Sequence, residues 1–472
     1  MPLIMLKLSV YESAENYAAM ESTLKQLQKD IPEASWVALS YARLLKKLDR
    51  DAEGLAILQQ FAEANPSNND VLFAYIEWLS VLAPEQMLAT LDKFIALNED
   101  KADLQFLKAQ YLTDTGDIEQ AKTVLKQLIP ADSKSADSLR ARNDLAVIAY
   151  QQDDSETAQT LVDEVLLISS EDERALLLAS QLLIDDQQVE KAVTHLRIIL
   201  RNNPQSDQAL VMLAQAYALS GDDELADDNF RQALTVNSGN TTAALSVADA
   251  LIKRDEINRA EQVLLTALEK QPEQASLLQA LAQVRLLKDD WAGTAQLVET
   301  LETRYPETGV TNYLDGRISE GQGQYEVAVD QYKAALQKQP DLNHALQGLH
   351  NSYKQLDDKK ALRDYLEDFS EKNPEQTTAK TMMADIYAEE GDWQQAYDLV
   401  QAGIASKPQW LPGYVKLADL HEQKKQYSDA EVAYQRGLSV NPDNLFLGMQ
   451  LAAFYERQQL FTDAKSTYEQ VL

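Results

Sequence analysis

The side chains that could carry out chemistry in this chain are scattered rather than grouped. The four histidines are His195, His344, His350 and His421, and there is no cysteine. His344 and His350 are six residues apart, which places them on different faces of one helix. The sequence has no His-Glu-x-x-His, Gly-x-Ser-x-Gly or Gly-Lys-Ser/Thr motif, the spacings that mark zinc hydrolases, serine hydrolases and phosphate-binding loops. We therefore expect no catalytic residue, no metal site and no cofactor.

One glycine-rich stretch resembles a dinucleotide-binding loop. Gly316, Gly321 and Gly323 lie within the segment Gly-Arg-Ile-Ser-Glu-Gly-Gln-Gly. A dinucleotide loop follows a β-strand, and no strand-like alternation precedes this stretch. Gly316 and Gly321 instead fall on recurring positions of a longer repeat, one at a helix crossing and one at a turn, so we interpret them as structural.

Pairs of aspartates are the other candidates for ligand chemistry. They occur at Asp153-Asp154, Asp222-Asp223 and Asp289-Asp290. The further ligands that a closed calcium loop needs are missing. Each pair comes just before an expected helix, where an aspartate can accept hydrogen bonds from free N–H groups at the positive end of the helix dipole. We predict that these pairs cap helices.

The charge of the chain narrows the class of partner. Among 472 residues, 75 are acidic and 43 are basic, which gives a net charge of −32. Such a chain repels nucleic acid and anionic lipid, because binding phosphate requires clusters of Lys and Arg. We expect neutral to basic protein or peptide partners. No apolar stretch approaches the roughly 20 residues that span a bilayer, so we expect no direct membrane insertion.

A proline recurs on a 34-residue grid, and small residues follow it at fixed distances. The single empty slot is Ser238, in an Asn-Ser-Gly turn sequence. Small residues ten and twenty-two positions after the slots suit close helix crossings, and a proline ends the second helix of each pair. The grid prolines are Pro204, Pro272, Pro306, Pro340, Pro374, Pro408 and Pro442. The small residues include Ala214, Ala248, Ala282, Gly316, Ala384, Ala418 and Ala452, and Ala192, Ala226, Ala260, Ala328, Ala396, Ala430 and Ala464.

An aromatic residue nineteen positions after a slot marks the expected start of a second helix. Exposed aromatic rings of this kind could stack on a ligand, but their shared register favours a packing role that seats the second helix. These residues are Trp291, Tyr325, Trp393, Tyr427 and Phe461.

This pattern resembles the tetratricopeptide repeat (TPR), in which a small residue, a large residue, Ala-x3-Phe and Pro recur every 34 residues. The resemblance implies an all-α fold, a right-handed α-solenoid or TPR superhelix of about fourteen helix-turn-helix repeats. We divide the chain into degenerate repeats at 1–136 and a regular array at 137–472, within one continuous solenoid. The register shortens by one residue at Glu99 and lengthens by three near 130–138, where we expect an extended loop.

Three repeats depart from the pattern. Bulky residues replace the small ones after Pro66 (Ile76 and Leu88) and after Pro340 (His350 and Leu362), and Arg285 and Thr294 stand at repeat positions after Pro272. Each departure is expected to shift the local helix crossing. The alternative is ordinary drift in repeats that are supported by their neighbours.

A polar ladder occupies the position eleven residues after each slot. In the TPR fold this side chain faces a concave groove, so the resemblance implies a partner-binding surface. Amides and carboxylates in a row can hydrogen-bond an extended backbone, and the alternative is a merely solvated surface. The ladder is Gln181, Gln215, Asp249, Gln283, Arg317, Asn351, Asp385 and Asp419. Its C-terminal end is acidic, and a basic segment would suit it best. A clamp for a chaperone's C-terminal carboxylate is not expected, because Gln347 stands where Lys is needed beside Asn351.

These observations favour a non-catalytic protein-interaction scaffold. Its overall repeat pattern is similar to that of bacterial multi-TPR scaffold proteins, which are found beside exopolysaccharide-export and envelope protein-sorting systems. One alternative is the substrate-selecting arm of a longer enzyme, such as a glycosyltransferase, with its catalytic domain outside this chain. A further alternative is direct polysaccharide binding along the ladder.

The N-terminus and the two ends bear on the compartment. Met1 to Leu8 lacks the basic region and cleavage site of a signal peptide, which favours a cytoplasmic location. Both ends lack the polar capping helix that repeat arrays usually have, so we expect a fragment of a longer protein. In that case a periplasmic or cell-envelope location becomes an option.

Overall fold

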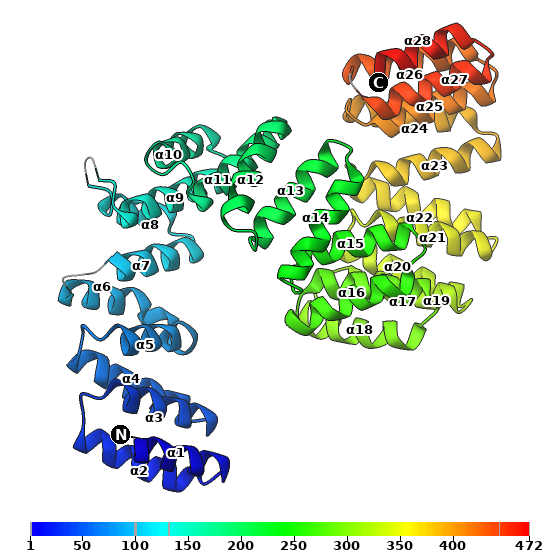
Figure 1. Ribbon diagram of the computed structural model, residues 1–472. Coiled ribbons are helices and arrows are strands. Elements are labelled where there is room, and N and C mark those ends of the chain that lie inside the picture. Colours follow the sequence, from blue (N-terminus) through cyan, green and yellow to red (C-terminus); the bar gives the residue numbers. More distant parts are fainter. Residues whose placement is uncertain (1, 99–101, 131–132, 443, 472) are drawn as a thin grey trace. The chain divides into compact units, whose positions relative to one another are not determined.

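The computed structural model describes residues 2–98, 102–130, 133–442 and 444–471. These residues form 28 α-helices and one short 3-10 helix, with no strand in the described part of the chain. The helices make two compact units, Met1–Ala226 and Asp227–Leu472, here called the N-terminal unit and the C-terminal unit. Figure 1 shows the helices following one another as a succession of helical hairpins. The predicted all-α solenoid of about fourteen helix pairs is thereby confirmed.

The helices that begin in the N-terminal unit are α1 (Pro2–Ser13), α2 (Tyr17–Asp30), α3 (Ser35–Lys47), α4 (Asp51–Ala64), α5 (Asn69–Leu82), η1 (Pro84–Gln86), α6 (Met87–Leu97), α7 (Ala102–Asp114), α8 (Ile118–Gln127), α9 (Ala136–Gln151), α10 (Ser155–Ile168), α11 (Glu173–Asp185), α12 (Val189–Asn202), α13 (Asp207–Leu219) and α14 (Asp223–Val236). Odd-numbered helices are the first and even-numbered helices the second members of each pair.

The helices of the C-terminal unit are α15 (Thr241–Lys253), α16 (Ile257–Lys270), α17 (Ala275–Leu287), α18 (Trp291–Arg304), α19 (Val310–Gly321), α20 (Tyr325–Lys338), α21 (Asn343–Gln355), α22 (Lys359–Lys372), α23 (Thr377–Glu390), α24 (Trp393–Ser406), α25 (Leu411–Gln423), α26 (Tyr427–Val440), α27 (Leu445–Arg457) and α28 (Phe461–Val471).

The proline grid marks the ends of second helices, as predicted. Helix α18 ends at Arg304 and α20 ends at Lys338, so Pro306 and Pro340 are each the second residue after a helix end. The turn inside each pair has its own marker, a residue with positive φ. This residue recurs every 34 positions at Asp153, Gln187, Gly221, Asp255, Asp289, Gly323, Asp357, Gly391, Lys425 and Gln459. Gly323 is therefore the turn glycine of its repeat, whereas Gly321 is still helical and lies against the ring of Trp291.

The small residues of the pattern lie at helix crossings. Ala214, Ala282 and Ala418 are each 0% exposed, and the alanines of the second helices are equally buried, for example Ala260 and Ala396. In a close-packed crossing, a larger side chain would have to push the helix axes apart. The predicted structural role of these positions is confirmed.

Two of the predicted aspartate caps are present. The side chain of Asp154 accepts a hydrogen bond from the backbone N–H of Thr157 at 3.1 Å, and Asp290 accepts one from Gly293 at 3.0 Å. The hydrogen bonds from Thr157 lower the pKa of Asp154, because they favour the charged carboxylate. Part of the acidity of the chain is thus used to begin its second helices.

Two of the three departures from the pattern loosen a helix pair. Helices α5 and α6 make far fewer contacts with each other than most pairs do, and so do α21 and α22. Bulky Ile76 and Leu362 occupy the crossings of these two pairs and are buried. Helices α17 and α18 remain close. Thr294, which stands at the alanine position of α18, is small and fully buried.

The predicted packing role of the aromatic residues holds for only part of the set. Each of the five begins a second helix, and Trp291 and Trp393 pack against the core of the C-terminal unit. Tyr427 and Phe461 are 42% and 67% exposed, so the packing interpretation is wrong for these two rings.

The first helices form the tighter row of the stack. In the C-terminal unit, every first helix from α15 to α25 contacts the next first helix, whereas the described second helices make no comparable contacts with one another. In the N-terminal unit α3 contacts α5, and α11 contacts both α9 and α13. Helix α7 does not approach α5 or α9 as closely within the described residues. The first helices are therefore farther apart on both sides of α7 than elsewhere in the row.

The connection predicted to be extended runs from Gln127 to Ala136 and is longer than its neighbours, such as the one from Ile168 to Glu173. Residues 131–132 of this loop and the shortened slot at Glu99 lie outside the described residues. The predicted division at 136/137 and the continuity of the array stay predictions.

Candidate functional site

Two adjoining cavities lie where the first helices of the N-terminal unit are spread. One is about 580 Å³ and lies between α5, α6, α7 and α9, and the other is about 380 Å³ and lies between α7, α8, α9 and α11. They share Leu107, Gln110, Asp114 and Arg140, and we call them together the N-terminal groove. Other residues that line it are Phe73, Ile76, Glu77, Met87, Asp103, Phe106, Asp144, Val147, Ile148 and Arg174.

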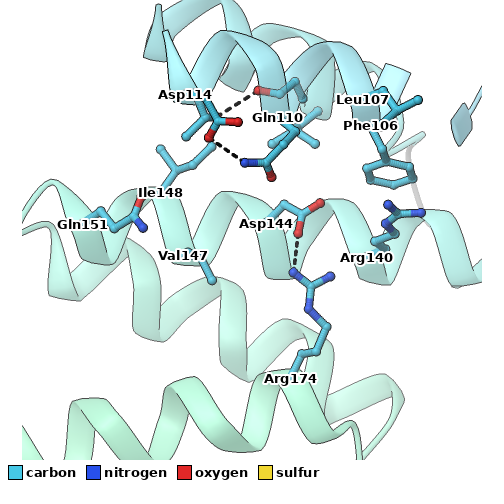
Figure 2. A pocket seen from close by; sticks show the side chains of 13 residues that line it. Phe106, Leu107, Gln110, Asp114, Arg140, Asp144, Val147, Ile148, Gln151 and Arg174 are labelled. Carbon is cyan, nitrogen blue, oxygen red and sulfur yellow. Dashed lines mark hydrogen bonds and ion pairs between the residues drawn. The ribbon is translucent and has the colours of Figure 1, made fainter. Parts of the chain in front are cut away.

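The floor of the groove is apolar and held by the core. Ile76 and Phe106 are each 4% exposed and belong to the clusters that join α5 to α6 and α7 to α8. Leu107 is half-buried and Val147 is 37% exposed. Figure 2 shows Leu107 and Phe106 on the upper helix and Val147 and Ile148 on the lower one. An accessible apolar surface inside a concave site is typical of binding sites.

Two arginines of the groove are held by partners within the chain. Figure 2 shows the guanidinium of Arg140 beside the ring of Phe106. Its Cζ lies 3.9 Å from the ring centroid, and its Nη1 is 3.3 Å from Asp103. The guanidinium of Arg174 is ion-paired with Asp144. Both positive charges are therefore already balanced by a neighbouring carboxylate.

Two carboxylates of the groove have no such partner. Asp114 accepts a hydrogen bond from the amide of Gln110 at 2.8 Å. Neither Asp114 nor Glu77 forms an ion pair with any described residue, and both are exposed. The larger cavity consequently combines an apolar floor with two unbalanced negative charges at its rim.

The N-terminal groove extends the predicted ladder. Glu77, Gln110 and Val147 stand eleven residues after the slots at 66, 99 and 136, and all three line the groove. Sequence reasoning missed them because the ladder was counted only through the regular repeats. The same count, carried back across the three-residue slip, would have found them.

All eight predicted ladder residues lie on first helices, and none is buried. Gln181 and Gln215 belong to the N-terminal unit, and the other six belong to the C-terminal unit. Several bond to their own helix, as Gln181 does to Asp185 at 2.8 Å and Asn351 does to Gln347 at 3.1 Å. The ladder is thus accessible, and its role in binding stays a prediction.

Arg317 and Asn351 line a cavity of about 400 Å³ in the C-terminal unit, together with Tyr313 and His344. The Nη1 of Arg317 donates a hydrogen bond to the hydroxyl of Tyr313 at 3.1 Å, and its Nε lies 3.7 Å from Glu320. Asn351 is exposed at the edge of this cavity. These two ladder residues are the ones that the structure brings into one cavity.

The acidic end of the ladder is largely paired. Asp385 accepts a hydrogen bond from Lys416 of the next first helix at 2.6 Å, and it also lines a cavity of about 350 Å³ beside His350. Lys359 lies 2.6 Å from Glu389, which lowers the pKa of that carboxyl. Asp419 differs, because burial raises its pKa and no hydrogen bond to its side chain is found among the described residues.

The described residues contain no group of three or more His, Asp or Glu side chains placed to hold a metal ion. None of their helices combines the length and the apolar character that crossing a bilayer requires.

Comparison with known proteins identifies the repeat. Tetratricopeptide repeat models match residues 102–134, 177–240 and 411–444. Intraflagellar transport protein 70B of Rattus norvegicus is 30% identical over 173 residues, which cover 34% of this chain and 26% of that protein. The chain therefore spans about a quarter of the length of this curated relative.

Two solved structures have a similar helical arrangement. A tetratricopeptide repeat protein from Parabacteroides merdae has a TM-score of 0.37 at 20% identity, over 53% of this chain and 98% of that one. Yeast Tom70 has a TM-score of 0.41 at 15% identity, over 93% of this chain and 96% of that one. At these values the similarity says nothing about a partner. The matched segments and the 34-residue grid of helix pairs lead to one conclusion: the chain contains tetratricopeptide repeats.

Proposed function

We propose that this chain is a non-catalytic scaffold that binds an extended segment of a partner protein along its first helices. The observation that carries the proposal is the location of the cavities. The N-terminal groove and the cavity beside Arg317 and Asn351 both open on the row of first helices. Amide and carboxylate side chains along such a row can pair with the backbone of an extended segment.

Charge favours neutral to basic partners. The net charge of −32 attracts cationic segments and speeds their encounter with the chain. The ion pairs of Asp385 and Glu389 reduce the local charge of the C-terminal ladder, whereas Glu77 and Asp114 leave the N-terminal groove with unbalanced charge. A multi-protein assembly of a bacterial envelope, for exopolysaccharide export or protein sorting, is the setting we propose for such a scaffold.

The test is a comparative affinity capture from the native host, read by quantitative mass spectrometry. The ladder variant replaces five ladder residues of the C-terminal unit by Ala, namely Gln283, Arg317, Asn351, Asp385 and Asp419. The control variant makes five Ala substitutions of matched charge at exposed residues of second helices, namely Arg259, Gln262, Glu299, Gln337 and Glu371. Circular dichroism of all three proteins checks that each remains folded.

Partners captured by the wild-type chain and the control variant but lost by the ladder variant support binding along the first helices. Equal losses in both variants, or identical partner sets in all three proteins, would contradict binding along the ladder of the C-terminal unit. The proposal would then depend on the N-terminal groove, which this variant leaves unchanged.

A further inference from the structure

We propose that the N-terminal groove recognises a segment in which a bulky apolar residue stands within three residues of a Lys or Arg. The apolar side chain enters the cavity between α5 and α7, and the cation is held by Glu77 and Asp114. This inference rests on the proposed function and specifies the chemistry of the segment that is bound.

The apolar cavity arises from a departure in the repeat. Ile76 and Leu88 stand where the regular repeats have small residues, and α5 and α6 make few contacts with each other. Ile76 and Met87 then form part of the lining of the 580 Å³ cavity, with Phe73 and Leu107 half-buried beside them. A cavity of this size is in the range of sites that take a whole ligand group. One aliphatic or aromatic side chain of a partner can therefore remove its surface from water there.

The charges at the rim select the neighbour of that side chain. Arg140 is the basic residue of this cavity, and it is engaged by Asp103 and by the ring of Phe106. Glu77 and Asp114 form no ion pair with a described residue and face the same cavity. An incoming Lys or Arg would be the first cation to reach these two carboxylates, with which it can make charge-assisted hydrogen bonds. An acidic residue at that place would be repelled, which gives the groove selectivity as well as affinity.

The test uses a phage-displayed library of random 12-residue peptides selected on the full chain. Four proteins are compared: the wild type, the double variant Glu77→Gln with Asp114→Asn, the variant Ser80→Trp and a control. Ser80 is an exposed residue of α5 that lines the cavity, so a Trp there can fill it without entering the core. The control carries Glu156→Gln and Glu190→Gln, two exposed glutamates on second helices of the same unit.

We expect the wild type and the control to enrich peptides with a Leu, Ile, Met or Phe within three residues of a Lys or Arg. The double variant should bind such a peptide about tenfold more weakly and lose the salt dependence of binding. Ser80→Trp should abolish enrichment of the apolar residue.

Two results would overturn the inference, and they differ in what they say about the proposed function. If selected peptides depend on Ser80→Trp but carry no basic preference, or keep it on the double variant, the groove binds segments of another chemistry and the proposed function stands. If no peptide is enriched over a bare surface, or none responds to Ser80→Trp, the N-terminal groove does not bind segments at all. The capture experiment with the C-terminal ladder then decides the proposed function on its own.

Discussion

The hydroxyl of Tyr332 on α20 donates a hydrogen bond to the carboxylate of Glu320 on α19 at 2.6 Å. The ring of Tyr332 is 0% exposed and fills the space beside Gly316 and Gly348, where a side chain on either glycine would collide with it. One side chain thus joins three helices, and burial together with the bond to Glu320 raises the pKa of its hydroxyl.

Tyr332→Phe tests this bond while the ring is kept. We expect the free energy of local opening of α19 and α20 to fall by about 1–2 kcal/mol, because a hydrogen bond to a charged group is lost and the carboxylate is left less satisfied. Hydrogen exchange of the amides in these two helices measures the change. Tyr325→Phe is the matched control, since Tyr325 begins the same helix and is not buried. Equal protection in wild type and Tyr332→Phe would show that the bond contributes nothing.

We predict that the same Ala→Trp substitution has very different effects on stability at two alanines of neighbouring repeats. Ala430 is 0% exposed in the core of the C-terminal unit, and Ala405 on α24 is exposed. Ala430→Trp is expected to overpack the crossing of α25 and α26 and to destabilise the unit by about 1–3 kcal/mol or more. Ala405→Trp should change stability by less than about 0.5 kcal/mol. Denaturant unfolding followed by circular dichroism compares the two, and similar midpoints would contradict the close packing at Ala430.

Much of this architecture could be predicted from the sequence because the repeat imposes its own register. Pro306 and Pro340 fix where helices end, and Ala282 and Ala418 fix where they cross, since each of these effects depends on one residue and its local geometry. The ladder could be placed on the first helices for the same reason. Its environment could not, because the bond between Lys416 and Asp385 joins two repeats and depends on how closely their helices approach.

The ladder positions of the N-terminal groove could be counted from the sequence, but the opening of its cavity could not be predicted, for a related reason. Ile76 and Leu88 could be recognised as departures, but the sequence does not say whether neighbouring helices absorb the extra volume or move apart. After Pro272 the pair stays close around Thr294, and after Pro66 it loosens. Only the packed structure distinguishes these outcomes, because they depend on the summed fit of many side chains.

The ion pairs of Glu21 are expected to make a pH-dependent contribution to the stability of the N-terminal unit. Its carboxylate lies 2.8 Å from Lys25 and 3.0 Å from Arg50. The hydrogen bonds from Lys25 and Arg50 lower the pKa of Glu21 from 4.5 to about 2. A carboxyl with a depressed pKa stabilises the fold above its unfolded pKa, and this contribution is lost as the pH falls from about 4.5 toward about 2.

Glu21→Gln should therefore lower the free energy of unfolding at pH 7 by about 1 kcal/mol, a value discounted for the solvent exposure of Lys25. The difference from wild type should shrink as urea unfolding is repeated at pH 4 and pH 3. The exposed Glu33→Gln is the control and should show little effect at any pH. A difference that stays constant with pH would mean that the amide disturbs packing rather than removing a charge.

For two aspartates of the ladder, we predict that replacement by Asn has opposite effects on the stability of the C-terminal unit. Burial raises the pKa of Asp419, and the charges of Glu422 and Asp385 raise it further against the opposing effect of Lys416 and Arg457. The ionised form of Asp419 thus opposes folding at neutral pH. Asp385 is instead bonded to Lys416, whose side chain is 15% exposed. Asp385→Asn leaves that ammonium without its carboxylate partner.

Asp419→Asn is expected to raise the stability of the C-terminal unit at pH 7, whereas Asp385→Asn is expected to lower it. The sign for Asp419 follows from linkage, because a raised pKa means that the folded state takes up a proton more readily than the unfolded state. The gain from Asn should therefore disappear as the pH falls through the folded pKa to below the ordinary value of 3.8, where Asp419 is protonated in both states. Thermal unfolding of both variants between pH 7 and pH 3.5 measures this. If Asp419→Asn destabilised the unit at pH 7, the carboxylate would have to be making a favourable contact in the folded chain, and the ladder at α25 would be a packed surface rather than one left open for a partner.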